Sequence, residues 1–256
     1  MTFLIGVFVF LLGIASGSFI SVVTYRLPLG ESVVRPGSRC TSCKEPITWK
    51  YNIPVLGFLL TKGKCAFCRE KVSVRYPFFE LLTGLLFLAV DLRSSTYWLL
   101  PSYLVLATGL IIVSIIDIKT MTIPRKVLYP ILCIGFIWLI IVSLVTHDEG
   151  ALLRSVIAGT GAFAIFTLLF LLFPRGIGFG DVRMIGVSSF FIGWIGYKDV
   201  LLSVIIGIIT AGLAAIFLLI GKKVSAKSRI PLAPFLAFGA IVVILYGPTI
   251  VKVWWR

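Results

Sequence analysis

The sequence predicts an all-α polytopic membrane protein with about eight transmembrane helices and one small domain outside the bilayer. Of its 256 residues, 59% are apolar and only 13% are charged, and the mean hydropathy is +1.09. Soluble domains are about 25% charged. Apolar runs near the ~20 residues that a spanning helix needs recur along the chain. These features exclude a large soluble catalytic domain, a disordered chain and a secreted disulfide scaffold.

The apolar runs predict spans at residues 3–23, 78–92, 97–116, 127–145, 152–173, 184–196, 199–220 and 231–247. The first run is interpreted as a span and not as a signal peptide, because no basic segment precedes Thr2 and Phe3. The chain is therefore expected to have three parts. These are a first transmembrane helix at 1–23, a loop domain at 24–77 and a transmembrane helical bundle at 78–256.

The distribution of charge predicts the topology. The chain has a formal net charge of +14, and residues 24–77 hold ten basic and three acidic residues. The positive-inside rule places this loop in the cytoplasm, and alternation then places residues 117–126, 174–183 and 221–229 on the same side. Topology and anionic membrane lipids account for the positive charge. No nucleic-acid partner is expected.

Two cysteine pairs in the loop predict a metal site. Cys40-Thr-Ser-Cys43 and Cys65-Ala-Phe-Cys68 are separated by 21 residues, close to the spacing of zinc ribbons. A loop this small needs a cross-link such as a bound metal ion to fold. Four thiolates in a reducing compartment suit a closed, structural Zn²⁺ site. A catalytic zinc is disfavoured because no coordination position stays open, and a redox dithiol is the other alternative. Cys133, alone in an apolar span, is expected to be a buried small hydrophobe.

Two carboxylates interrupt the pattern at the edges of spans. Asp117 follows an apolar run directly, and Asp181 ends the sequence Gly178-Phe-Gly180-Asp181 after the fifth span. The charge argument places both on one membrane face. If they share a water, repulsion raises one pKa, which leaves one carboxylate as general base and the other as general acid, as in aspartic proteases. Each could instead be a helix-end residue paired with basic neighbours. The one histidine, His147, is expected in a solvated turn on the opposite side.

Taken in order, these motifs resemble the type IV prepilin leader peptidases, the GxGD aspartic proteases that process type IV pilins and pseudopilins. The matching segments are residues 17–28, 39–43, 52–54, 65–68, 75–84, 116–124, 178–181 and 231–239. The resemblance implies that Asp117 and Asp181 are the catalytic pair, supported by the motif residues Pro124, Gly178 and Gly180.

The resemblance also implies a substrate and a second activity. The substrate is a prepilin or pseudopilin whose basic leader is cut at the cytoplasmic face of a bacterial plasma membrane. Many family members then transfer a methyl group from S-adenosylmethionine to the new N-terminal amine, an activity assigned to the loop region and to a glutamate at the position of Glu80. No segment resembles the cofactor turn of a soluble methyltransferase.

Three positions depart from the family pattern. Ser21 replaces a common Asn, Arg125 follows Ile-Pro where an acidic or amide side chain is common, and Arg183 stands where the family has Lys. Other classes remain open. The aspartates could bind protons or cations in a small transporter or channel, or a non-catalytic assembly factor could dock through the loop. Presenilin-like GxGD proteases are a third alternative, but they lack a four-cysteine loop.

Overall fold

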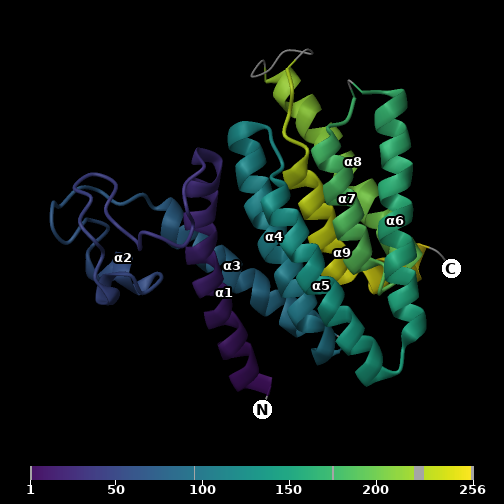
Figure 1. The fold of residues 1–256 in the computed structure, drawn as a ribbon, viewed down its shortest axis with the longest axis horizontal. Helices are drawn as coiled ribbons and strands as arrows, with labels where there is room; N and C mark the ends of the chain where they lie inside the picture. Colours follow the sequence, from purple (N-terminus) through teal and green to yellow (C-terminus); the bar gives the residue numbers. More distant parts are fainter. Residues whose placement is uncertain (1, 95, 175, 222–227, 255–256) are drawn as a thin grey trace. The chain divides into compact units, whose positions relative to one another are not determined.

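The computed structural model describes residues 2–94, 96–174, 176–221 and 228–254 (Figure 1). Within them the regular structure is helical, with two isolated bridges, Arg39 to Pro46 and Lys64 to Lys71, and no strand. The prediction of an all-α fold is confirmed. The chain divides into two compact units, residues 1–92 and 93–256. Arg175 and most of the predicted connection at 221–229 lie outside the described residues.

Unit 1 consists of two long helices and the loop between them. The long helices are α1 (Thr2–Arg26) and α3 (Arg75–Arg93), and the loop contains the short α2 (Leu56–Leu60) and the 3-10 turns η1 (Leu27–Leu29) and η2 (Trp49–Tyr51). A Cβ on Gly17 of α1 would lie 2.6 Å from the Cα of Glu80 in α3. Because glycine has no side chain, the two backbones can approach this closely, which fixes the first turn of α3 against α1.

The buried Arg26 organises the segment that follows α1. Its guanidinium donates hydrogen bonds to the carbonyl oxygens of Ser32 at 3.2 Å, Pro36 at 2.7 Å and Gly37 at 3.0 Å. Three carbonyl acceptors suit the fork of N–H donors on a guanidinium group. The chain is thereby folded back onto the end of α1 before it enters the cysteine pairs.

Unit 2 is a bundle of helices. In chain order these are α4 (Leu100–Thr120), α5 (Arg125–Thr146), α6 (Glu149–Leu172), α7 (Phe179–Ile192), α8 (Tyr197–Ile220) and α9 (Ala233–Trp254), and the turn η3 (Tyr97–Leu99) precedes α4. Met121 and His147 end α4 and α5 in the left-handed conformation, and Asp148 caps α6 by accepting the Ala151 N–H at 2.9 Å. His147 is exposed in its turn, as expected.

The order of the unit 2 helices brings three chain segments to one end of the bundle. Consecutive helices reverse direction, so the end of α4 and the starts of α7 and α9 lie together (Figure 1). Helix α9 packs against both α4 and α8, and α7 packs against α6. Although α7 has only 14 residues, nearly all after its first turn are buried. The short helix is therefore part of the core.

Six helices of the described residues are long and apolar enough to cross a membrane, which supports a multi-pass membrane protein. The segments are Phe3–Leu29, Tyr97–Thr120, Arg125–Thr146, Glu149–Leu172, Tyr197–Ile220 and Ala233–Trp254. All eight predicted spans fall on helices, but α3 and α7 are not among these six. Helix α3 carries Glu80, Asp91 and Arg93. Helix α7, about 21 Å long, is shorter than a hydrocarbon core of about 30 Å.

The prediction that Cys133 is buried is wrong. It lies on the exposed face of α5. In a membrane protein both the lipid-facing and the core-facing sides of a helix are apolar, since lipid tails are as apolar as leucine. The apolar run therefore carried no information about which side Cys133 occupies.

Candidate functional site

Asp117 lies near the end of α4 with its carboxylate against the start of α9. The residue is only 5% exposed, and its Oδ2 accepts the N–H of Ala233 at 3.1 Å. The N–H of Leu232 also hydrogen-bonds this carboxylate. Ala233 is the first residue of α9, so a helix N-terminus points at Asp117. Unpaired N–H groups and the helix dipole favour negative charge there, which stabilises the ionised form.

Asp181 lies in the first turn of α7 and is half-buried. Its Oδ2 accepts the N–H of Gly178 at 3.3 Å, while its own N–H donates to the Gly178 carbonyl at 3.0 Å. A Cβ on Gly178 would lie 2.9 Å from that Oδ2. The first glycine of the GxGD sequence is therefore required by the close approach of the aspartate that follows it.

The two aspartates lie close enough for their carboxyl groups to interact electrostatically. Burial, and after it repulsion from the Asp117 carboxylate, raises the pKa of Asp181 from 3.8 to about 6. Neighbouring carboxyl groups in a partly desolvated site favour sharing one proton. Each carboxylate also accepts two backbone N–H groups, from Ala233 and Leu232 at Asp117 and from Gly178 and its own backbone at Asp181.

Pro124 and Gly180 hold the two aspartate-bearing segments in place. Pro124 is the N-cap of α5, and its carbonyl accepts the N–H of Val127 at 3.1 Å. The preceding Ile123 is buried, and a Cβ on Gly180 would lie 2.9 Å from the Cβ of Ile123. The connection after α4 therefore packs directly on the turn that begins α7.

The four predicted metal ligands are brought together in unit 1. The Sγ atoms of Cys40, Cys43, Cys65 and Cys68 all lie within 4.8 Å of one another, and those of Cys40 and Cys68 are 3.8 Å apart. A tetrahedral ion with metal–sulfur bonds of about 2.3 Å places its sulfurs about 3.8 Å apart. The donor set and its spacing therefore fit a metal ion.

The two cysteine pairs have the same local fold. The N–H of Cys40 donates to the Glu45 carbonyl at 2.9 Å, and that of Cys65 donates to the Glu70 carbonyl at 2.8 Å. Lys44 and Arg69 occupy equivalent left-handed positions, with φ of 62° and 60°. Around Cys40, the N–H groups of Cys43 and Ser42 lower the pKa of the thiol to about 6. Backbone donors aimed at sulfur favour the thiolate, which is the form that binds metal.

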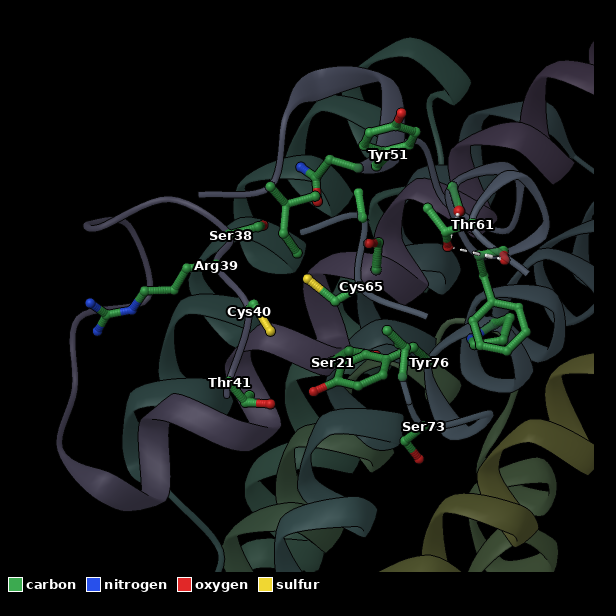
Figure 2. Close-up of a pocket in the computed structure, with 18 of the residues that line it drawn as sticks. Ser21, Ser38, Arg39, Cys40, Thr41, Tyr51, Thr61, Cys65, Ser73 and Tyr76 are labelled. Carbon is green, nitrogen blue, oxygen red and sulfur yellow. Dashed lines mark hydrogen bonds between the residues drawn. The ribbon is translucent and has the colours of Figure 1, made fainter. Parts of the chain in front are cut away.

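A cavity of about 410 Å³ opens beside the cysteine cluster, within unit 1 (Figure 2). Its walls come from the end of α1, the cysteine pairs, residues 51–58 and the start of α3. Figure 2 shows Tyr51, Tyr76 and Ser21 among the residues that line it, with Cys40 and Cys65 on the same wall region and Arg39 extending away. Aromatic rings and a few polar groups around a concavity of this size are typical of small-molecule sites.

Glu80 lies in the wall of this cavity with its carboxylate held by the protein. The residue is 6% exposed, and its Oε2 accepts the N–H of Val55 at 2.7 Å. The Ser18 hydroxyl donates a second hydrogen bond. These two donors stabilise the ionised form of the carboxylate. Sequence reasoning identified Glu80 but missed Val55 and Ser18.

Two family models match the chain. The Bacterial Peptidase A24 N-terminal domain matches residues 11–94, and the Type IV leader peptidase family matches residues 104–247. The chain belongs to the type IV leader peptidase family. The resemblance drawn from the motifs is therefore confirmed. The N-terminal match contains the four cysteines and Glu80, and the second match contains Asp117 and Asp181.

Curated relatives match most of the length of this chain. It is 33% identical over 207 residues to a prepilin leader peptidase/N-methyltransferase of Klebsiella pneumoniae, covering 78% of this chain and 90% of that protein. It is 28% identical over 243 residues to the protein of the same name from Bacillus subtilis (strain 168), covering 95% of each. No solved structure matches.

Proposed function

We propose that the chain cuts the basic leader from type IV prepilins or pseudopilins at the cytoplasmic face of a bacterial plasma membrane, and then methylates the new N-terminus. The observation that carries the peptidase proposal is the pair of carboxylates at one end of unit 2. Asp117 receives the N-terminus of α9, and Asp181 lies in the first turn of α7. The names of the curated relatives support both activities.

We assign the carboxylate to Asp117 and the acid to Asp181, because burial, and after it repulsion from Asp117, raises the pKa of Asp181 to about 6. Asp117, as the carboxylate, removes a proton from a water, and the water oxygen attacks the scissile carbonyl carbon. Asp181, as the acid, gives its proton to the carbonyl oxygen, so a neutral gem-diol forms. Collapse of the gem-diol breaks the C–N bond. Asp117 then returns its proton to the leaving amine, and Asp181 regains one from the diol.

The membrane arrangement is part of the proposal. We assign α3 and α7 as the two remaining membrane-embedded helices, which gives about eight, and the functional division 1–23, 24–77 and 78–256. The positive-inside rule supports a cytoplasmic position for residues 24–77 and for both aspartates. A transporter is disfavoured because its ion sites lie near the bilayer midplane. Asp117 and Asp181 instead lie at helix ends.

The metal in this proposal is zinc, with a structural role. Soft thiolate donors in a tetrahedral set of four favour Zn²⁺, and such a set leaves no position for a water. The ion would link the two cysteine pairs of unit 1. Metal binding in so small a domain supplies folding free energy.

Methyl transfer is assigned to the cavity of unit 1. Its volume of about 410 Å³ lies within the range of about 300–1,000 Å³ for small-molecule sites. Tyr51 and Tyr76 offer aromatic faces that would attract a sulfonium cation and stack on a base. S-adenosylmethionine, when bound, supplies an electrophilic methyl group. The neutral N-terminal amine of the cleaved substrate is the nucleophile.

One experiment tests both activities. The chain is coexpressed with a candidate prepilin, and the mature N-terminus is analysed by mass spectrometry. The proposal expects a product that lacks its leader and carries one added methyl group. An intact leader refutes the peptidase activity, and a cleaved product without the methyl mass refutes the methyltransferase activity. Asp117→Asn serves as the control for cleavage by host enzymes.

A further inference from the structure

The backbone at Val55 has a conformation that valine rarely adopts. Its φ is 61° and its ψ is −52°, and the N–H of Leu56 donates to the Pro54 carbonyl at 2.6 Å. This is a three-residue γ-turn of the hand that is rare and strained. For a β-branched residue a positive φ is a true outlier, and such strain persists only where surrounding contacts enforce it.

The contact that enforces this turn is the carboxylate of Glu80. Its Oε2 accepts the N–H of Val55 at 2.7 Å. The Ser18 hydroxyl holds the same carboxylate, and the contact of Gly17 with the Glu80 backbone fixes the helix turn that carries it. A buried charged acceptor, itself anchored between α1 and α3, therefore holds the turn.

The turn sets the shape of one wall of the cavity. The residues on either side of it, among them Tyr51, Ile53 and Phe58, line that wall. Beyond the turn, the N–H of Gly57 donates to the Ile53 carbonyl at 2.7 Å, and Gly57 packs against the carbonyl of Tyr51. If the turn relaxes, the wall moves as a whole. The site proposed for methyl transfer changes with it.

We propose that Glu80 is a positioning residue for methyl transfer, whose carboxylate acts by holding the γ-turn at Val55 and does not contact the amine or the cofactor. The inference rests on the proposed methyltransferase function. Both partners of the carboxylate are groups of the protein itself, the Val55 N–H and the Ser18 hydroxyl.

The two roles of Glu80 differ in what they need. Positioning needs a hydrogen-bond acceptor in the right place, which the amide oxygen of glutamine also supplies. Binding a cationic sulfonium or orienting an amine through charge needs the carboxylate. Glu80→Gln therefore separates the two roles, and Glu80→Leu removes the acceptor in either case.

The test uses the full chain in lipid nanodiscs with a prepilin substrate. Methylation of cleaved product is measured against S-adenosylmethionine concentration, and cleavage in the same sample reports folding. Glu80→Gln is expected to keep at least about half of wild-type methylation. Glu80→Leu should lower it about tenfold or more, chiefly through a higher KM for the cofactor, as expected when a buried charged acceptor is lost. Glu80→Gln as inactive as Glu80→Leu would overturn the proposal.

A double-mutant cycle shows whether Glu80 acts through Val55. Glycine adopts positive φ at little cost, so in a Val55→Gly background the turn needs less support. The loss caused by Glu80→Leu should then shrink to about threefold or less, since coupled residues are not additive. A matched control is Val74→Gly, at an exposed valine outside the cavity, in which the full loss should remain. An undiminished loss in the Val55→Gly background would overturn the proposal.

Hydrogen exchange keeps this test independent of the methyltransferase assignment. In Glu80→Leu the amides of residues 55–57 should exchange faster than in wild type, and in Glu80→Gln they should not. A wild-type enzyme that cleaves without methylating refutes the proposed second activity. In that case, unchanged exchange in Glu80→Leu would separately refute the contact between Glu80 and Val55.

Discussion

Gly180 and Ile123 are in direct contact in unit 2, and this contact links the two segments that carry the aspartates. A Cβ on Gly180 would lie 2.9 Å from the Cβ of Ile123 and 3.3 Å from its Cγ1. Gly180 immediately precedes Asp181, and Ile123 lies in the connection that follows α4 and Asp117. The second glycine of the GxGD sequence thus sets how closely the start of α7 approaches the end of α4.

Gly180→Ala should therefore reduce cleavage. The added methyl group forces the two segments apart, and overpacking of this kind costs about 1–3 kcal/mol. A displacement of the reacting groups by about 1 Å can lower the rate by about 100-fold. We expect kcat/KM for prepilin cleavage to fall by about 10- to 100-fold while the protein remains in the membrane.

The matched control is Gly161→Ala in α6. No atom lies within 4 Å of a Cβ built on Gly161. Alanine there should leave cleavage unchanged and favour the helix slightly. If Gly180→Ala cleaved prepilin at the wild-type rate, the contact with Ile123 would not determine the geometry of the two aspartates.

Asp117→Asn and Asp181→Asn should each abolish leader cleavage. One carboxylate must accept a proton and the other must donate one, and each such function contributes about 100- to 10,000-fold. Asp199→Asn is the matched control. Asp199 is also a buried aspartate in the first turn of a helix, but α8 begins at the opposite end of the bundle. Substantial cleavage by either catalytic variant would contradict the aspartic mechanism and favour a docking or ion-binding role.

The candidate residues that the sequence predicts are those that stand out from their immediate neighbours in the sequence. Asp117, Asp181 and the four cysteines were identifiable because a carboxylate beside an apolar run, or paired cysteines at fixed spacing, is unusual in itself. Their partners are not local. The Ala233 N–H that receives Asp117 comes from a helix that begins 116 residues later, and any residue except proline carries such a donor.

The same limit explains what was missed in unit 1. The positive φ of Val55 has no sequence signature, because glycine or asparagine is expected where φ is positive. Only the nearby Asn52-Ile-Pro54 segment marked the region. The difference between eight predicted spans and six long apolar helices has another cause. Helix α3 carries charged residues, and α7 is short. Apolar runs alone do not distinguish a helix that crosses the bilayer from a shorter helix buried in the protein.

The cysteine cluster should bind about one zinc ion per chain. Replacing Cys40 and Cys43 with serine should remove the metal and increase hydrogen exchange throughout residues 38–72, because the ion supplies folding free energy to this small domain. Elemental analysis of reduced, chelator-free protein measures the metal directly. The exposed Cys133→Ser, outside the cluster, is the control and should keep full zinc. Protein without metal, or disulfides among these cysteines, would contradict the assignment.

The rate of prepilin cleavage should fall as the pH rises above about 6. The pKa of Asp181 is raised from 3.8 to about 6, and the mechanism requires this residue in its protonated form. Below the raised pKa the acid holds its proton, and above it the protonated fraction falls about tenfold per pH unit. A plot of kcat/KM against pH should therefore fall at high pH with an apparent pKa near 6. The Asp199→Asn variant, as a control, should show the same profile. A flat profile between pH 5 and 8 would contradict this.

The same pKa shift predicts how stability depends on pH. Because folding raises the pKa of Asp181, the folded state binds the proton more tightly than the unfolded state does. The associated stability is present below about pH 4 and is lost as the pH rises through about 6. Asp181→Asn removes this dependence, so the variant should gain Tm relative to wild type as the pH is raised from 4 to 7. Thermal unfolding in nanodiscs measures this difference, and one that stays constant over that range would show that burial does not shift the pKa of Asp181.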